Sequence, residues 1–188
     1  MSLPDLPDLP DGRGWVLLLA LLLLWTLGAH NRITALKAAV LAAWQQVDSA
    51  LQARGQALSV LLGAVTGPLA TEAAALDAVT QAQAQVQAAA DAVRRAPVAA
   101  DAVVDLGKAD AVLGAVLVRL LALVEQQPAL LGDPTVAEAL KTLRESPARL
   151  AFARQMFNEA GAAYNAATSQ FPTRLLGGVL RFGRAGRL

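Results

Sequence analysis

Apolar residues recur at steps of three and four along most of the chain, which is the spacing of one face of an α-helix. The clearest stripe places bulky residues seven apart with alanines between them: Leu150, Phe157, Tyr164 and Phe171, with Ala153, Ala160 and Ala167. Seven residues make two helical turns, so these side chains share one face, and the alanines let a second helix approach closely. The stripe predicts a core helix of a helical bundle.

Prolines and glycines divide the pattern into separate helices. The first apolar stripe runs from the N-terminal region to about residues 63–68, where Gly67-Pro68 gives a strong stop. Further stripes predict a second helix over about residues 69–95 and a third over about 98–127, each followed by a proline.

The last helix contains an internal proline. Asp133 and Pro134 have the pattern of an N-cap followed by a first helical residue. Pro147 then falls inside the stripe, where a proline costs about 3 kcal/mol. We therefore expect a short helix near residues 134–144, a break or kink, and a long helix over 147–171.

The fold class follows from this pattern and from composition. Hydrophobic residues make up 55% of the 188 positions and aromatic residues only 4%. Alanine and leucine dominate, both favour helices, and no segment alternates with period two for long. We expect an all-α protein: a transmembrane helix that continues into an elongated antiparallel bundle of about four helices. The bundle occupies residues 33–172, and its expected core aromatics are Trp44, Phe157, Tyr164 and Phe171.

The N-terminal region predicts a membrane anchor. Residues 1–12 form a short acidic, proline-rich tail, and residues 15–29 then carry no charge and include eight leucines. Counted between its flanking arginines, segment 13–32 has 20 residues, which is enough to cross a bilayer. The expected anchor residues at the two interfaces are Arg13, Trp15, Trp25 and Arg32.

A signal-peptide core is the alternative for this apolar run, because its uncharged length is only fifteen residues. The acidic tail before it and Leu27, at the position where a cleavage site needs a small residue, favour an uncleaved span. Arg32 and Lys37 follow the span, whereas only Arg13 precedes it. This excess of positive charge predicts that the bundle is cytoplasmic and the N-terminus outside.

The sequence contains no pattern typical of catalysis or of cofactor binding. There is no cysteine, and the one histidine, His30, has no Glu-x-x-His partner of the kind that di-iron bundles use. We therefore expect no catalytic, metal or cofactor site and no enzymatic activity. The net charge of +1 gives no reason to expect nucleic acid as a partner.

Two charged residues interrupt otherwise apolar seams. Arg54 falls between two leucines of the first helix, and Asp110 falls between two leucines of the third. A charge at a seam position can fix helix register. Either the two residues pair inside the bundle, or each lies at the rim and reaches solvent.

The segment 173–188 is basic and carries no acidic residue. Apolar residues lie between its four arginines, which are Arg174, Arg181, Arg184 and Arg187. Such a segment is typical of contact with a membrane surface or with an acidic partner. A flexible solubilising tail is the alternative.

Several blocks resemble the LemA family. The most specific are RLAFARQMFNEA at 149–160, AYNAA at 163–167 and FP at 171–172, with AW at 43–44 and LALVE at 121–125 in the same order as in the family. The resemblance covers residues 15–172. It implies a bacterial protein with one N-terminal span, a short outer N-terminus and a long helical bundle, and it implies no enzymatic activity. This chain departs from the family pattern at residues 56–61 and 146–148.

The expected function is a membrane-anchored scaffold or interaction module at the bacterial inner membrane. Its partners would be the lipid bilayer and either other membrane proteins or copies of itself. Small residues that would allow close helix packing in a homo-oligomer are Gly28, Ala29, Ala35, Ala38, Ala39, Ala42 and Ala43. The alternatives are a lipid-binding or membrane-remodelling protein and an accessory subunit of a membrane enzyme.

Overall fold

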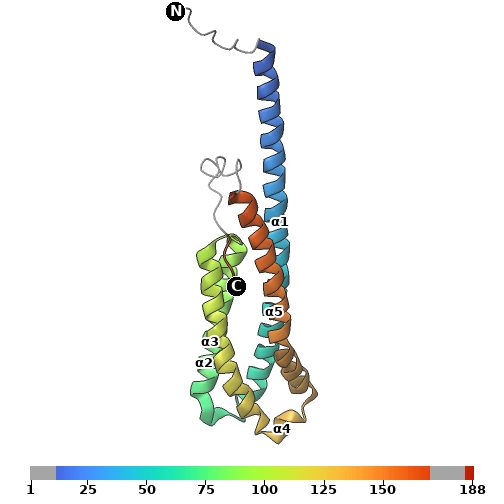
Figure 1. Ribbon diagram of the computed structural model, residues 1–188. Helices are drawn as coiled ribbons and strands as arrows, with labels where there is room; N and C mark the ends of the chain where they lie inside the picture. Colours follow the sequence, from blue (N-terminus) through green and yellow to red (C-terminus); the bar gives the residue numbers. More distant parts are fainter. Residues whose placement is uncertain (1–11, 170–184) are drawn as a thin grey trace, which may run out of the picture.

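The computed structural model describes residues 12–169 and 185–188 (Figure 1). The described part of the chain contains helices and no strands, which confirms the all-α prediction. The helices are α1 (Gly12–Val65), the short 3-10 helix η1 (Ala70–Glu72), α2 (Ala73–Arg95), α3 (Ala100–Glu125), α4 (Pro128–Leu131) and α5 (Pro134–Ser169).

The four long helices run alternately down and up, and form an elongated antiparallel bundle (Figure 1). α1 packs most extensively against α5, and α2 packs most extensively against α3. With 54 residues, α1 is about 80 Å long. Its N-terminal part extends beyond the bundle as a single unaccompanied helix (Figure 1).

Aromatic side chains fill the interface between α1 and α5. The rings of Trp44 and Phe157 meet edge to face, with centroids 6.1 Å apart. Both residues are buried, as is Tyr164 two turns further along α5. Ala153 and Ala167 are also buried in the α5 stripe, whose periodicity therefore matches the observed contact face. Phe171, the fourth expected core aromatic, lies outside the described residues.

Of the break or kink expected at Pro147, the break is wrong, because α5 is one continuous helix from Pro134 to Ser169 instead of two helices. Pro147 has no N–H to donate to the carbonyl of Leu143, four residues earlier. The buried hydroxyl of Ser146 donates to that carbonyl instead, at 2.8 Å. A neighbouring side chain thus replaces the missing backbone hydrogen bond, and Leu150 lies in the middle of the helix rather than at its first turn.

The expected cap at the start of α5 is confirmed. The carboxylate of Asp133 accepts hydrogen bonds from the backbone N–H of Thr135 at 2.7 Å and of Val136 at 3.4 Å. These N–H groups stabilise the charged carboxylate, so the pKa of Asp133 lies below its ordinary value. The cap fixes where the chain leaves the short α4 turn and enters α5.

Candidate functional site

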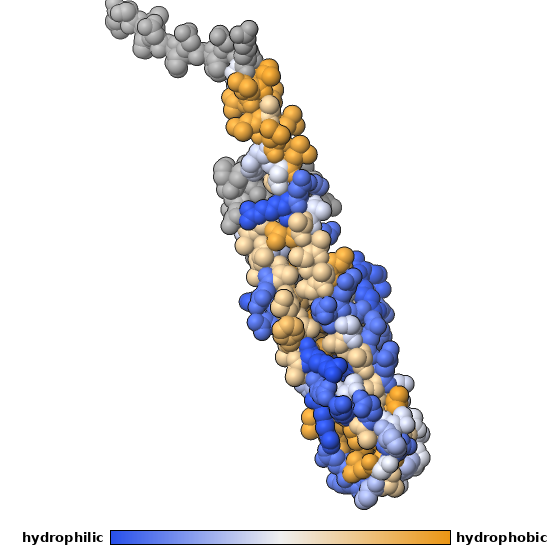
Figure 2. All heavy atoms as spheres, turned by 90° about the vertical axis from the view of Figure 1, so that its right-hand side faces the viewer, coloured by the Kyte–Doolittle hydropathy of each residue, from blue (hydrophilic) through white to orange (hydrophobic). Residues whose placement is uncertain are grey.

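Among the described residues, the most exposed apolar surface lies on α1 before the bundle begins. Its large side chains are all at least half exposed: Trp15, Val16, Leu17, Leu18, Leu19, Leu21, Leu22, Leu23, Leu24 and Leu27. Figure 2 shows them as an apolar band that no polar residue interrupts on the visible face. The first core residue of α1 is Ile33. Such a surface is stable in lipid rather than in water.

The length and hydropathy of α1 are compatible with a single membrane span. The candidate span, Gly14–Val65, contains a window of mean hydropathy 1.6, of which only 6% is buried inside the protein. The core helix of a soluble protein would be mostly buried. Of the expected anchors, Trp15 and Arg32 are exposed and Trp25 is half-buried, while the side chain of Arg13 lies outside the described part.

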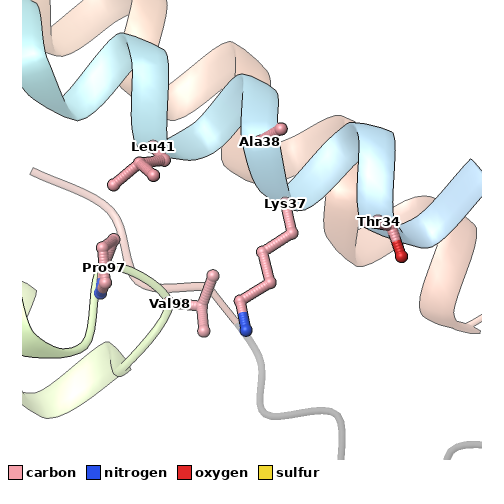
Figure 3. A pocket seen from close by; sticks show the side chains of 6 residues that line it. All are labelled: Thr34, Lys37, Ala38, Leu41, Pro97 and Val98. Atoms are coloured by element: carbon pink, nitrogen blue, oxygen red, sulfur yellow. The ribbon is translucent and has the colours of Figure 1, made fainter.

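An apolar pocket lies directly below this segment, where α1 passes the connection between α2 and α3 (Figure 3). Its volume is about 270 Å³. Its walls come from one face of α1 and from two residues of the connection: Thr34, Lys37, Ala38, Leu41, Pro97 and Val98. Lys37 is the only charged residue among them, but the surface of the pocket is almost entirely apolar, so the part of a ligand inside it would be apolar.

The two seam charges meet inside the bundle. Arg54 on α1 donates to one carboxylate oxygen of Asp110 on α3, and both side chains are almost fully buried, at 6% and 11% exposed. Arg154 on α5 donates to the second oxygen of the same carboxylate. One buried carboxylate therefore joins three helices, because two guanidinium groups share it.

The sequence singled out Arg54 and Asp110 but not Arg154. Arg154 lies beside the α5 stripe among polar residues, a position typical of a solvated face. Nothing local distinguishes it from the exposed Arg149, which pairs with Glu145 at 2.6 Å on the same helix.

A second ion cluster, which the sequence did not indicate, ties α2 to α1. The guanidinium of Arg94 donates to both carboxylate oxygens of Asp48, at 2.7–3.0 Å, and also to Asp91. The hydrogen bonds that Arg94 donates to Asp48 are the main reason why the pKa of Arg94 is raised. Arg94 is about one-third exposed, so this cluster is weaker than the buried one.

Both ion clusters have the geometry of structural contacts. The oxygens of Asp110 and Asp48 accept hydrogen bonds from arginines of neighbouring helices, so each carboxylate is held in an ion pair between helices. Within the described ranges, no three histidine, cysteine or acidic side chains come together to hold a metal ion. What the clusters can do is fix the register of α1 against α2, α3 and α5.

The basic residues of the C-terminal segment divide into two groups. Arg174, Arg181 and Arg184 lie outside the described residues. Arg187 is exposed. It belongs to Ala185–Leu188, which we call the tail segment. The tail segment lies against the bundle between α3 and α5 (Figure 1).

The LemA family model matches residues 43–187, which is most of the chain. The chain belongs to the LemA family. The family assignment made from the sequence is therefore confirmed, and the match extends beyond residue 172, where the recognised blocks ended. No curated protein matches the chain.

Proposed function

We propose that this LemA-family protein is a membrane-anchored, non-enzymatic scaffold of the bacterial inner membrane. The observation that carries the proposal is the continuity of α1. One helix contains both the exposed apolar segment and a buried face of the bundle. A rigid helix of this kind holds the bundle at a fixed distance from the bilayer, whereas a flexible linker would not.

An exposed apolar patch on α5 supports a protein partner. Phe152 is 68% exposed and Met156 is 42% exposed, and the two are one helical turn apart. Aromatic and methionine side chains are enriched at protein interfaces. The exposed alanines of α1 (Ala35, Ala38, Ala39 and Ala42) offer a second surface, on which another copy could pack closely.

Photocrosslinking in native membranes tests the scaffold role. Benzoylphenylalanine replaces Phe152 in one variant and Lys108, whose side chain is 71% exposed on α3, in a control variant. We expect a discrete crosslinked protein band, or a dimer of this chain, from position 152 only. Equal crosslinking from both positions, or none from position 152, would contradict the proposal.

The orientation is proposed on the basic residues that follow the apolar segment. Arg32 and Lys37 are both exposed and lie between the apolar segment and the main part of the bundle. Their positive charge supports a cytoplasmic bundle. Because the chain has no cysteine, a single introduced cysteine reports its own side of the membrane. A membrane-impermeant maleimide added to intact cells should label Ser2→Cys and leave Gln85→Cys unlabelled. The reverse labelling would invert the orientation.

A lipid-handling role is the second candidate, and the pocket beside Lys37 is the observation in its favour. The pocket lies next to the proposed membrane surface, its walls are apolar, and Lys37 is one of the residues that border it. If lipid binding is the function, Lys37→Ala should lower the amount of anionic phospholipid that copurifies with the protein, while crosslinking from position 152 stays absent. An accessory subunit of a membrane enzyme would instead appear as a specific enzyme in the crosslinked band.

A further inference from the structure

Two asparagines of α5 hold the tail segment by its backbone. The side-chain amide of Asn165 donates to the carbonyl of Ala185 at 3.0 Å, and its oxygen accepts from the N–H of the same residue at 2.8 Å. Asn158 forms the same pair of bonds with Leu188, both at 2.9 Å. Each asparagine thus satisfies both backbone groups of one residue, as a neighbouring β-strand would.

The spacing of the two asparagines matches an extended peptide. Seven residues of α-helix separate Asn158 from Asn165, a rise of about 10.5 Å. Three residues of extended chain separate Ala185 from Leu188, a span of about 10 Å. Because Asn165 binds the earlier residue and Asn158 the later one, the peptide runs antiparallel to α5.

The surface between the asparagines accepts only small residues. Ala185 and Gly186 are buried there. The side chain of Ala185 faces Gly161, where an added Cβ would lie 3.4 Å from that of Ala185. An added Cβ on Gly186 would lie 2.8 Å from the Cβ of Val103 and 2.9 Å from the backbone of Ala100 on α3. A side chain at position 186 would therefore force the peptide out or shift α3.

We propose that the groove between α3 and α5 is a binding site for an extended peptide with a small residue followed by glycine. Asn158 and Asn165 recognise the peptide backbone, and the close approach of Ala100 and Val103 selects glycine. The tail segment of the same chain fills the site in the structure. The tail segment of a second copy is the occupant that can replace it, since its sequence is the one whose fit the contacts show. This site goes beyond the scaffold role and does not require it, because its contacts are made by Asn158, Asn165 and the start of α3 and not by the exposed patch of Phe152 and Met156.

The experiment uses the full chain in detergent micelles and a fluorescent peptide, RAGRL, copied from residues 184–188. In the wild type, the attached tail competes at a high effective concentration, so the peptide should bind weakly. Gly186→Val displaces the attached tail and leaves both asparagines in place. Fluorescence anisotropy should then show at least tenfold tighter binding of RAGRL to Gly186→Val than to the wild type.

Two matched controls identify the recognised groups. The peptide RAVRL should bind Gly186→Val at least tenfold more weakly than RAGRL does, because the groove excludes a side chain at the glycine position. Adding Asn158→Asp and Asn165→Asp to Gly186→Val should abolish RAGRL binding, since the aspartates keep the shape but cannot donate to the peptide carbonyls. Circular dichroism of each variant verifies that the helices are intact.

Hydrogen exchange supplies an independent readout. The N–H groups of Ala185 and Leu188 both donate to asparagine side chains, so they should be protected in the wild type and unprotected in Gly186→Val. Protection that persists in Gly186→Val would overturn the requirement for glycine. A released tail without peptide binding, or equal binding of both peptides, would overturn the site itself. Neither result would bear on crosslinking from position 152, so the two proposals fail separately.

Discussion

Both halves of α1 are rich in apolar residues, but only the second half buries them inside the protein. In the exposed half, residues 14–32, leucines surround the helix and lie outside the protein core. In the bundle half, residues 33–65, buried positions such as Val40, Trp44 and Val47 recur on one face. The distribution of apolar residues around the helix, rather than their number, therefore decides whether a segment faces lipid or a bundle core.

The largest effect is expected when arginines are placed in the exposed half of α1. Leu19→Arg with Leu23→Arg puts two charges into the proposed span, at a cost of about 3 kcal/mol each. We expect the protein to leave the membrane fraction in a flotation assay. Gln56→Arg with Val60→Arg is the matched control, since both positions are exposed in the bundle half and have the same four-residue spacing. Flotation of both double variants would show that residues 14–32 are not the membrane anchor.

The two tryptophans give the next comparison. Trp44 is 2% exposed and packs on Phe157, so Trp44→Ala should lower the free energy of unfolding of the bundle by about 3–5 kcal/mol. Trp15 is 54% exposed, and Trp15→Ala should change that free energy by less than about 0.5 kcal/mol. Denaturant unfolding in detergent, followed by circular dichroism, measures both. Similar losses would mean that the two halves share one packed core.

The buried ion pair of Arg54 and Asp110 tests how much an unpaired charge destabilises the bundle. Asp110→Ala leaves Arg54 buried without its partner and should cost about 3–5 kcal/mol of stability. The double variant Arg54→Met with Asp110→Leu removes the buried pair and should recover most of this loss, because the remaining Arg154 is about one-third exposed and can be solvated. The same unfolding assay applies. If the double variant is no more stable than Asp110→Ala, the loss comes from the ion pair with Arg154 rather than from the unpaired charge of Arg54.

The packing face of the bundle half also depends on α5 remaining helical past Pro147. Ser146→Ala leaves the carbonyl of Leu143 without its donor and should cost about 1–3 kcal/mol. Adding Pro147→Ala restores a backbone N–H and should recover the loss. Without that recovery, the hydroxyl of Ser146 would not be the substitute donor.

The smallest expected effect concerns alkaline pH. Burial raises the pKa of Tyr164 above its ordinary value of 10.0, because the phenolate is disfavoured in the core. The folded state therefore retains its proton better than the unfolded state, and stability should fall as the pH rises above about 10. Tyr164→Phe should remove this part of the pH dependence. Unfolding curves at pH 9 and 10.5 for both proteins measure the difference, and identical slopes would contradict it.

Several features of the fold were predictable because they depend on residues close together in the sequence. The stripe containing Phe157 and Tyr164, the cap at Asp133 and the apolar segment before Ile33 all follow from helical period or from local hydrogen bonding. The error at Pro147 shows the limit of such reasoning. The cost of a proline is a local average, and in α5 the hydroxyl of Ser146 and the packing of the helix against α1 both oppose it.

The candidate sites were less predictable because their residues are far apart in the sequence. Arg54 and Asp110 were recognisable as charges in apolar seams, but Arg154 joins them only through the packing of α5, 44 residues from Asp110. Asn158 and Asn165 resemble ordinary exposed polar residues of a helix. Their role depends on the return of the tail segment, which no local pattern indicates.

The sequence by itself determined the helices, their approximate ends, the single apolar segment and the family. Each of these depends on a period of 3.6 residues, on turn chemistry or on a contiguous motif, all of which act within a few residues. Only the tertiary structure decided which charges are buried together, how α5 continues through Pro147 and where Ala185–Leu188 binds. These outcomes depend on which helix faces meet, and that choice is made by the packing of the whole bundle.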